Sequence, residues 1–404
     1  IIHTIFIPSK VSKICEKAFL NCWGLTKVEI PQNSNLQTIE KNVFDYSKIK
    51  EIYIPSSLKE LKDGWCCFTE HLTKIEISPL NDQFVFKEDK YLLGKSEQSN
   101  NEYDVLLFAR RDIEEISIPP NIKIISSYAF EKCRKLKKVE IPQNSNLQTI
   151  GKYAFSDSHI HTIFIPSKVS KICKYAFYFC MYLTKINIPH NSNLQTIEKN
   201  AFAFSGIEDI YFPASMKELK EGWCCNTKHL TKIEISPLND QFIFKEDIYL
   251  LGKSDQNNDE FDVFLFAHRG IKEISIPPNI KIISSFAFDS CNNLIKVEFP
   301  PNSNLHTIEK HAFQNTSVKE ICIPPSLKIL SSYSFAICQN LMKFEIPRNS
   351  NLQEIGEKVF ELSEIKEIYF PASLKELKEG WRDCMAHLTK IEISPLNDQF
   401  VFKE

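Results

Sequence analysis

Apolar and charged residues alternate in short runs along the whole chain. In one run, Val28 and Ile30 are apolar, whereas Lys27 and Glu29 are charged. Successive side chains of a β-strand point to opposite faces, so this alternation predicts a strand with one buried and one solvated face. An Ile-Pro pair such as Ile30-Pro31 closes the run, where proline ends the strand.

These strand-like runs recur every 23 or 24 residues, with occasional steps of 41 residues, and the whole pattern repeats every 158 residues. Residues 77–130 and 235–288 have nearly the same sequence. Periods of this size are typical of solenoids, in which each turn buries its apolar face only against its neighbours. We expect one right-handed β/α solenoid over residues 1–404, with about sixteen turns and short 3₁₀ or α segments between strands. A parallel β-sheet is expected on its concave face.

The 41-residue steps contain extra strand-like segments around a polar stretch. They predict β-hairpin insertions at about 80–112 and 238–270, with mobile tips at 94–102 and 252–260. The sequence begins and stops within a repeat copy, so we expect a fragment of a longer array.

Thirteen cysteines are present. Five of them occupy the same position of the repeat, three residues after the phenylalanine of an Ala-Phe or Ser-Phe pair. The column consists of Cys22, Cys133, Cys180, Cys291 and Cys338. Successive members are at least two turns apart, which is about 10 Å at ~4.8 Å per turn and beyond disulfide reach. We therefore predict small, buried, free thiols.

The composition excludes several classes of function. Lys plus Arg (49) nearly balances Asp plus Glu (51), so no basic field favours nucleic acid or anionic lipid. No apolar run approaches the roughly 18–20 residues of a membrane span. With 10 glycines and no nucleophile–base arrangement, neither a phosphate loop nor a catalytic centre is predicted. We expect no enzyme activity and no cofactor.

Cys66, Cys67 and His71 could form part of a zinc site, because thiolates and imidazole are zinc ligands. The third copy of this segment has Arg382 and Asp383 in place of the two thiols. The repeat therefore folds without a metal there, and core packing is the preferred interpretation.

The outward positions of the strands form two columns. In the first, lysine and glutamate alternate from turn to turn, as at Lys27, Glu51 and Lys74. We expect cross-strand ion pairs in which each cation lies between two anions and contributes a few tenths of a kcal/mol per pair.

The second column places an aromatic ring on alternate turns, flanked by carboxylates. Exposed rings on a rigid surface are typical anchors for a protein partner. The alternative is that the rings only cover aliphatic stems and favour the strand conformation. The candidate ligand-binding residues on the concave face are Tyr53, Phe164, Tyr211, Tyr369, Glu29, Glu76 and Glu234.

One unit of the repeat, from Ile7-Pro8 through Ala18-Phe19 and Cys22 to Ile30-Pro31, resembles the treponemal-type leucine-rich repeat of the BspA-like family. The resemblance covers essentially the whole chain and is closest in style to trichomonad paralogues. The units with Gly64-Trp65 and its copies depart from the pattern, so the resemblance does not predict how these turns pack. The resemblance implies a curved β-solenoid, exposure on the cell surface, and adhesion to host matrix proteins, host cells or other microbes.

Three functions follow as expectations. The first is a cell-surface or extracellular adhesin that binds host or microbial proteins multivalently, since linked copies of a patch raise avidity. The second is an intracellular interaction scaffold, because thirteen free thiols suit a reducing compartment. The third is a stalk that only displays a distal head.

Overall fold

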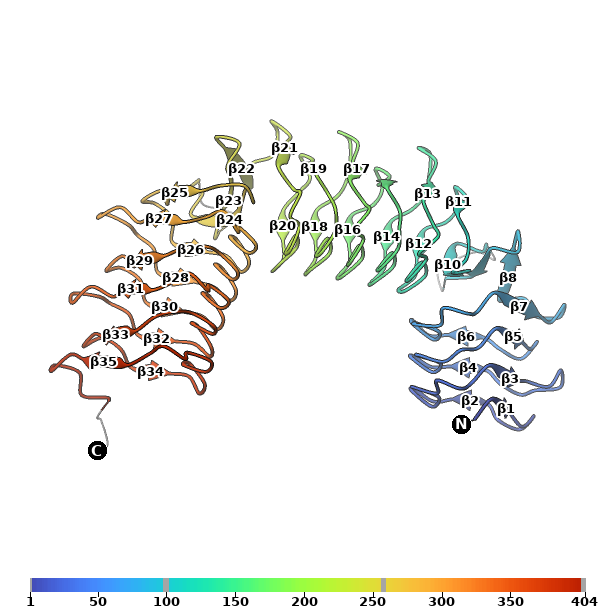
Figure 1. Ribbon diagram of the computed structural model, residues 1–404. Helices are drawn as coiled ribbons and strands as arrows, with labels where there is room; N and C mark the ends of the chain where they lie inside the picture. Colours follow the sequence, from blue (N-terminus) through green and yellow to red (C-terminus); the bar gives the residue numbers. More distant parts are fainter. Residues whose placement is uncertain (1, 97–101, 256–258, 401–404) are drawn as a thin grey trace. The chain divides into compact units, whose positions relative to one another are not determined.

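The computed structural model describes residues 2–96, 102–255 and 259–400. It consists of two compact units: the first contains Ile1–Ile207 and Ser215–Cys224, and the second contains Glu208–Ala214 and Cys225–Glu404. Within each unit the turns of a β-solenoid stack on one another (Figure 1). The two units together have about 17 turns, close to the sixteen predicted. The single continuous array over residues 1–404 stays a prediction.

One long face of each unit is formed by the strands that carry the outward columns, called the main sheet. In the first unit these strands are β1 (Thr4–Phe6), β3 (Lys27–Glu29), β5 (Glu51–Ile54), β7 (Lys74–Ile77), β11 (Glu115–Ser117), β13 (Lys138–Glu140), β15 (Thr162–Phe164) and β17 (Lys185–Asn187). In the second unit they are β19 (Asp209–Phe212), β21 (Lys232–Ile235), β25 (Glu273–Ser275), β27 (Lys296–Glu298), β29 (Glu320–Cys322), β31 (Lys343–Glu345), β33 (Glu367–Phe370) and β35 (Lys390–Ile393). All recorded pairings between main-sheet strands within each unit are parallel, as predicted.

A second parallel sheet is built from two-residue strands. In the first unit these are β2 (Lys13–Ile14), β4 (Thr38–Ile39), β6 (Glu60–Leu61), β12 (Ile124–Ile125), β14 (Thr149–Ile150), β16 (Lys171–Ile172), β18 (Thr196–Ile197) and β20 (Glu218–Leu219). In the second unit they are β26 (Ile282–Ile283), β28 (Thr307–Ile308), β30 (Ile329–Leu330), β32 (Glu354–Ile355) and β34 (Glu376–Leu377).

The segments at the 41-residue steps form antiparallel strands that join this second sheet. In the first unit, β8 (Phe84–Lys87) pairs with β9 (Tyr91–Gly94), and β9 pairs with β10 (Val105–Ala109). Strand β10 then pairs in parallel with β12, so the insertion extends an existing sheet. The second unit repeats this with β22 (Phe242–Lys245), β23 (Tyr249–Gly252) and β24 (Val263–Ala267). The predicted mobile tips lie largely at 97–101 and 256–258, outside the described residues.

The prediction of short helices between the strands is wrong: across the described residues these segments are tight turns. Tyr153 and Asp157, four residues apart, have φ angles of 55° and 54°. A right-handed helix needs negative φ throughout, so such residues interrupt it. Backbone donors of the segment instead reach the next turn, as where the Phe155 N–H donates to the Ala176 carbonyl at 2.8 Å.

The core between the sheets is a ladder of phenylalanine rings. Phe155 is fully buried and stacks on Phe130 at a centroid distance of 4.8 Å and on Phe177 at 5.3 Å. Phe288 and Phe313 form the same contact in the second unit, 4.5 Å apart. Phe19, in the first turn of the chain described, is only partly buried. Rings with a turn on both sides, such as Phe155, are therefore fully desolvated, as a solenoid requires, whereas a ring at an end is not.

Candidate ligand-binding face

The aromatic column predicted on the main sheet is present. Tyr53 lies in register with Glu76 on the neighbouring strand, Tyr211 with Glu234, and Tyr369 with Glu392. Phe164 lies beside Asn187 in the same way. The four predicted rings, Tyr53, Phe164, Tyr211 and Tyr369, are all half-buried, so each packs partly on the sheet and shows part of its surface to solvent.

On the side toward the preceding strand, the main sheet beside these rings has few backbone hydrogen bonds. Strands β3 and β5 pair only between Lys27 and Glu51, at one end of the strands. Strands β31 and β33 lie in separate two-stranded sheets. These openings coincide with the 24-residue steps, whereas strands separated by 23 residues pair over three or four residues. Tyr53 and Phe164 therefore lie beside strand pairs joined at a single residue pair, and Tyr369 lies beside a strand of a separate sheet.

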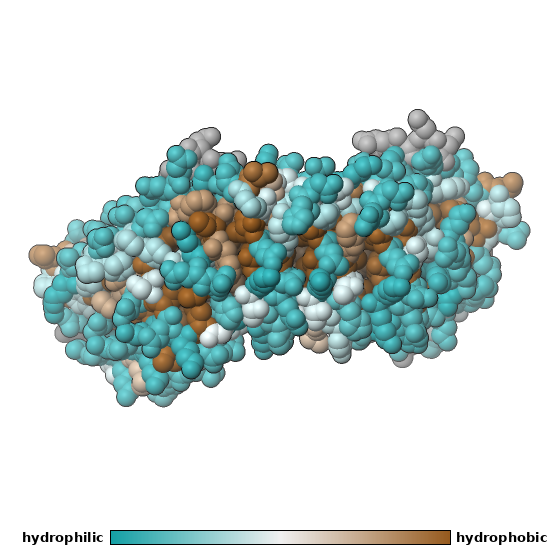
Figure 2. Space-filling model, turned by 90° about the horizontal axis from the view of Figure 1, so that it is seen from above, coloured by the Kyte–Doolittle hydropathy of each residue, from teal (hydrophilic) through white to brown (hydrophobic). Residues whose placement is uncertain are grey.

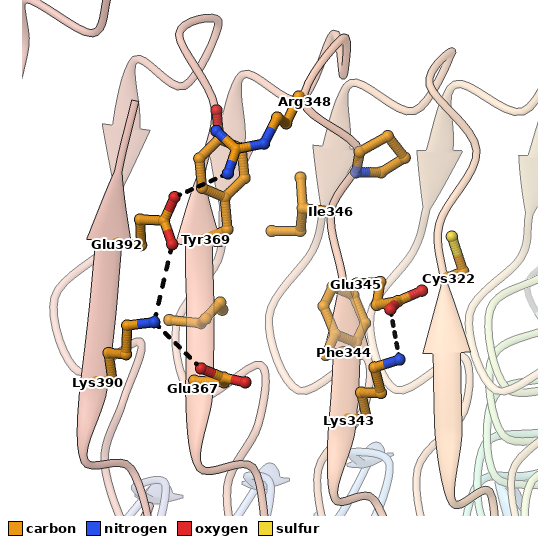
Figure 3. A pocket seen from close by; sticks show the side chains of 12 residues that line it. Cys322, Lys343, Phe344, Glu345, Ile346, Arg348, Glu367, Tyr369, Lys390 and Glu392 are labelled. Carbon is orange, nitrogen blue, oxygen red and sulfur yellow. Dashed lines mark hydrogen bonds and ion pairs between the residues drawn. The ribbon is translucent and has the colours of Figure 1, made fainter. Parts of the chain in front are cut away.

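The opening between β31 and β33 holds a surface groove of about 540 Å³ (Figure 3). Tyr369 stands on one side of the groove, and the buried side chains of Phe344 and Ile346 belong to its lining on the other. Cys322 and Lys343 line it further along the sheet (Figure 3). The volume is in the range of 300–1,000 Å³ that ligand sites in proteins occupy.

Arg348 covers one end of this groove. Its guanidinium lies over the Tyr369 ring, 5.3 Å from the ring centroid, and its Nη2 donates to Glu392 Oε1 at 3.2 Å. The loop that carries Arg348 is held from the next turn, where the Ser373 hydroxyl donates to the carbonyls of Ser350 (2.7 Å) and Leu352 (2.8 Å). A cation, an aromatic ring and a carboxylate from three successive turns are thus brought together.

The charged column is arranged differently from the prediction. Most of its lysines pair with the glutamate two residues along the same strand, as in Lys27–Glu29 (2.8 Å) and Lys138–Glu140 (2.5 Å). Residues i and i+2 share one face of a strand, which places them within reach of a long lysine stem. Cross-strand pairs of the expected kind occur at Lys74–Glu51 (3.5 Å) and Lys390–Glu367 (3.4 Å).

The predicted carboxylates Glu29, Glu76 and Glu234 all take part in these same-strand pairs. Hydrogen bonding to Glu29 raises the pKa of Lys27. All these side chains are solvated, so they contribute little to stability and remain accessible to a ligand.

Of the predicted ligand-binding residues, the groove contains Tyr369 alone; Tyr53, Phe164 and Tyr211 occupy equivalent places on other turns. Sequence reasoning missed Arg348. Its position in the repeat is otherwise occupied by Gln32, Gln143, His190 and Pro301, so its charge is a departure from the repeat that marks it.

The predicted burial of the cysteine column holds for four of its five members, whereas Cys22 is only partly buried. All thirteen cysteines are free, and Cys133, Cys180, Cys291 and Cys338 are completely buried. The Cys180 Sγ donates to the Phe155 carbonyl at 3.0 Å, and burial raises the pKa of its thiol to about 12. Around Cys66 and Cys67, as elsewhere in the described residues, no cluster of three or more metal-ligating side chains is found.

Two of the three turns with the Gly-Trp departure bury their indole ring, at Trp65 and Trp223, whereas Trp381 is only partly buried. Trp65 is buried and meets Phe44 edge-on at 6.4 Å, which continues the aromatic ladder with a larger ring. Cys66 and Cys67 fill the space beside it. The departure therefore leaves the core continuous.

Hydrophilic residues cover much of the surface shown in Figure 2, and hydrophobic side chains are visible between them. Three of the most exposed apolar residues are copies of one position: Leu80, Leu238 and Leu396 are 82%, 83% and 83% exposed. Among the described residues, no helix has the length and apolar character needed to cross a membrane.

Comparison with known proteins places the repeat in a family. A family model described as BspA type Leucine rich repeat region (six copies) matches residues 1–88, 105–231 and 259–384. No curated protein matches the sequence significantly.

Solved structures share the fold at low sequence identity. A leucine-rich cell surface protein from Faecalibacterium prausnitzii is 20% identical, with a TM-score of 0.57 over 77% of this chain and 92% of that one. The pneumococcal vaccine antigen PcpA is 17% identical, with a TM-score of 0.54 over 78% and 82%. A leucine-rich repeat protein from Eubacterium ventriosum is 17% identical, with a TM-score of 0.54 over 69% and 72%.

Proposed function

We propose that this chain, which belongs to the BspA-type leucine-rich repeat family, is a non-catalytic adhesin that binds host or microbial proteins at the cell surface. The observation that carries the proposal is the groove of the main sheet where Arg348, Tyr369 and Glu392 meet. Tyrosine and arginine are among the residues that dominate protein–protein binding energy.

The groove suits a protein ligand better than a small apolar molecule. Its floor is apolar at Phe344 and Ile346, whereas its rim carries both signs of charge, as at Lys343 and Glu367. An apolar centre with a polar, solvated rim is the usual anatomy of a protein interface. Because the openings between main-sheet strands run along the strands, an extended segment of a partner fits them.

Repetition supports multivalent binding. Tyr53 with Glu76, Tyr211 with Glu234, and Tyr369 with Glu392 are copies of one arrangement separated by 158 residues. A ligand with repeated epitopes gains avidity from linked copies without any new contact. Each copy need bind only weakly.

The surface location is supported by the family and by the description of the Faecalibacterium relative as a cell surface protein. One observation favours an intracellular scaffold instead: all thirteen cysteines are free, which suits a reducing compartment. A membrane-impermeant label applied to intact cells distinguishes the two, since only a surface protein is modified.

The proposed binding is tested by capture from extracellular-matrix extract. A variant with Tyr53, Tyr211 and Tyr369 changed to alanine is expected to recover less protein than the wild type. The matched control changes three aromatic residues away from the main sheet and from its groove, Tyr103, Phe261 and Tyr333, and should bind like the wild type. Equal recovery by the wild type and the main-sheet variant contradicts the proposal.

A further inference from the structure

A second candidate site lies on the first unit, at the turns that connect the two sheets. In each turn two residues four positions apart have positive φ, as at Tyr128 (64°) and Lys132 (55°) and at Tyr153 (55°) and Asp157 (54°). These residues form two rows, and a trough of about 490 Å³ lies between them. Its floor includes Glu131 and Ser156, and Phe68 and Phe179 line it as well.

One wall of the trough is aromatic but shows only ring edges. Tyr153 stacks on Tyr128 at 5.1 Å and on Tyr175 at 4.6 Å, so both of its faces are covered. The outer face of Tyr128 meets Gly64, where a Cβ atom would lie 3.0 Å from the ring. The phenolic hydroxyls remain for a ligand, which favours hydrogen bonding over stacking on the ring faces.

The opposite wall is made of ion pairs. Lys132 Nζ lies 2.6 Å from Glu70 Oε1 and 5.0 Å from the centroid of the Phe68 ring. Arg134 Nε donates to Asp157 Oδ2 at 3.1 Å, and its Nη2 contacts the same oxygen. A guanidinium has five N–H donors, so Arg134 keeps three for a ligand.

A more cationic groove of about 380 Å³ adjoins the trough and shares Lys132 and Arg134 with it. Lys50 and Lys135 also line this groove, and neither makes an ion pair with a described residue within 4.0 Å. Its acidic lining residues are Glu70 and Asp112. Four exposed or half-exposed cations therefore face two carboxylates, each of which already has a basic partner.

The other long repeat lacks these side chains. At the positions 158 residues later, Lys50, Lys132, Arg134 and Lys135 are replaced by Glu208, Ser290, Asn292 and Asn293. Tyr178 and Phe179 are replaced by Ala336 and Ile337. The preceding segments 77–130 and 235–288 have nearly the same sequence, whereas 131–188 and 289–346 differ at many positions, the groove-lining ones among them. The fold does not require these residues, since the second unit forms the same turns without them.

We propose that the two adjoining grooves of the first unit bind an anionic saccharide. A sugar ring has hydroxyl groups that can hydrogen-bond to the phenolic hydroxyls of Tyr128 and Tyr153 and to the ion pairs on the opposite wall. Its carboxylate or sulfate group faces Lys132 and Arg134, where charge-assisted hydrogen bonds are the strongest available.

Other anionic ligands fit less well. A single-stranded nucleic acid needs free ring faces on which bases stack, and these rings have theirs covered. An acidic peptide satisfies the cations but has few hydroxyl groups for the polar wall. The saccharide site is separate from the main-sheet groove of the second unit, so the two proposals succeed or fail independently.

The test is titration calorimetry of the full chain with a sulfated heparin tetrasaccharide and with an unsulfated, carboxylated hyaluronan tetrasaccharide. The variants K132S/R134N and Y128F/Y153H introduce the residues of the other repeat, which the same turns accommodate, since His311 stacks between Phe286 and Tyr333 there. Each is expected to raise the Kd of the saccharide that binds by at least tenfold. The control K138S/K185N removes two exposed lysines from the main sheet of the same unit and should change the Kd less than twofold.

Binding of either tetrasaccharide with this pattern supports the site, and the preferred one tells whether sulfate or carboxylate is recognised. The proposal is overturned if neither tetrasaccharide binds, or if Y128F/Y153H binds like the wild type, which would indicate a charge patch only. It is also overturned if polyglutamate or a single-stranded oligonucleotide binds more tightly than both saccharides. Unchanged capture of protein ligands by K132S/R134N confirms that the main-sheet groove is intact.

Discussion

The guanidinium of Arg348 lies over the ring of Tyr369 and also donates to Glu392, so one side chain joins three turns of the second unit. The Arg348→Gln variant removes the cation while it keeps a polar side chain. We expect about a tenfold loss of affinity for the captured protein ligand, because exposed arginines beside tyrosine are typical hot spots. The free energy of unfolding should change by less than about 1 kcal/mol, since the interactions of Arg348 are solvated. Surface plasmon resonance and thermal denaturation measure the two effects.

The control for this change is Arg382→Gln, which removes an exposed arginine of the same unit outside the groove. Equal losses of affinity in both variants would show that Arg348 acts only through net charge.

The phenylalanine ladder predicts a large cost for one core truncation. Phe155 is fully buried between Phe130 and Phe177, so Phe155→Ala leaves a cavity that the neighbouring turns cannot fill. We expect the free energy of unfolding to fall by about 3–5 kcal/mol in urea denaturation. Phe19→Ala, at a ring that is only partly buried, should cost clearly less. Similar costs at the two positions would argue against desolvation by turns on both sides.

The buried carboxyl of Glu131 should make the stability of the protein depend on pH. Burial raises the pKa of this carboxyl to about 7, although nearby Arg111 and a hydrogen bond from the Phe68 N–H (2.9 Å) act in the other direction. The native state then holds a proton that the unfolded state releases near pH 4.5. Stability contributed by the protonated carboxyl is present below about pH 4.5 and is lost as the pH rises to about 7, with a total change of about 3 kcal/mol.

The variant Glu131→Gln keeps an acceptor for the Phe68 N–H but does not titrate. Unfolding of this variant, followed by circular dichroism between pH 4.5 and 8, should lack that part of the pH dependence. An identical pH profile in the wild type and the variant would refute the assignment.

Thiol accessibility gives a further prediction. Cys15, Cys322 and Cys384 are exposed, whereas Cys133, Cys180, Cys291 and Cys338 are buried, and burial raises the pKa of each of these four thiols. Because the thiolate is the reactive form, native protein treated with iodoacetamide should be modified first at the three exposed positions. Peptide mapping by mass spectrometry identifies the sites. Early modification of Cys180 would mean that the turns open far more than stacked rings allow.

Much of the fold follows from the alternation of residues such as Lys27, Val28 and Glu29. A period of two fixes which side chains are buried, and the spacing of 23 or 24 residues fixes which strands are neighbours. The sequence pattern predicts short helices where the structure has turns, because Tyr153 and Asp157 adopt positive φ although neither is glycine. Aspartate tolerates that conformation, but tyrosine gives no such signal; the N–H groups of both residues donate to carbonyls of the next turn, which holds them there.

The candidate sites were less accessible to sequence reasoning. Tyr369 could be placed on the outward face by its register, but its contact with Arg348 depends on a loop whose path the alternation does not determine. The trough on the first unit joins Phe68 to Tyr128 and Lys132, which are about 60 residues apart because an insertion separates their turns. Only the stacked structure shows that these turns are neighbours.

The most direct test of the proposed binding face is photo-crosslinking from position 369. Benzoylphenylalanine in place of Tyr369 puts the reactive group at the groove, and the same residue in place of Tyr333 puts it at a turn of the same unit. After irradiation in extracellular-matrix extract, the account predicts a protein adduct from position 369 and none from position 333. Adducts from position 333 alone would contradict it.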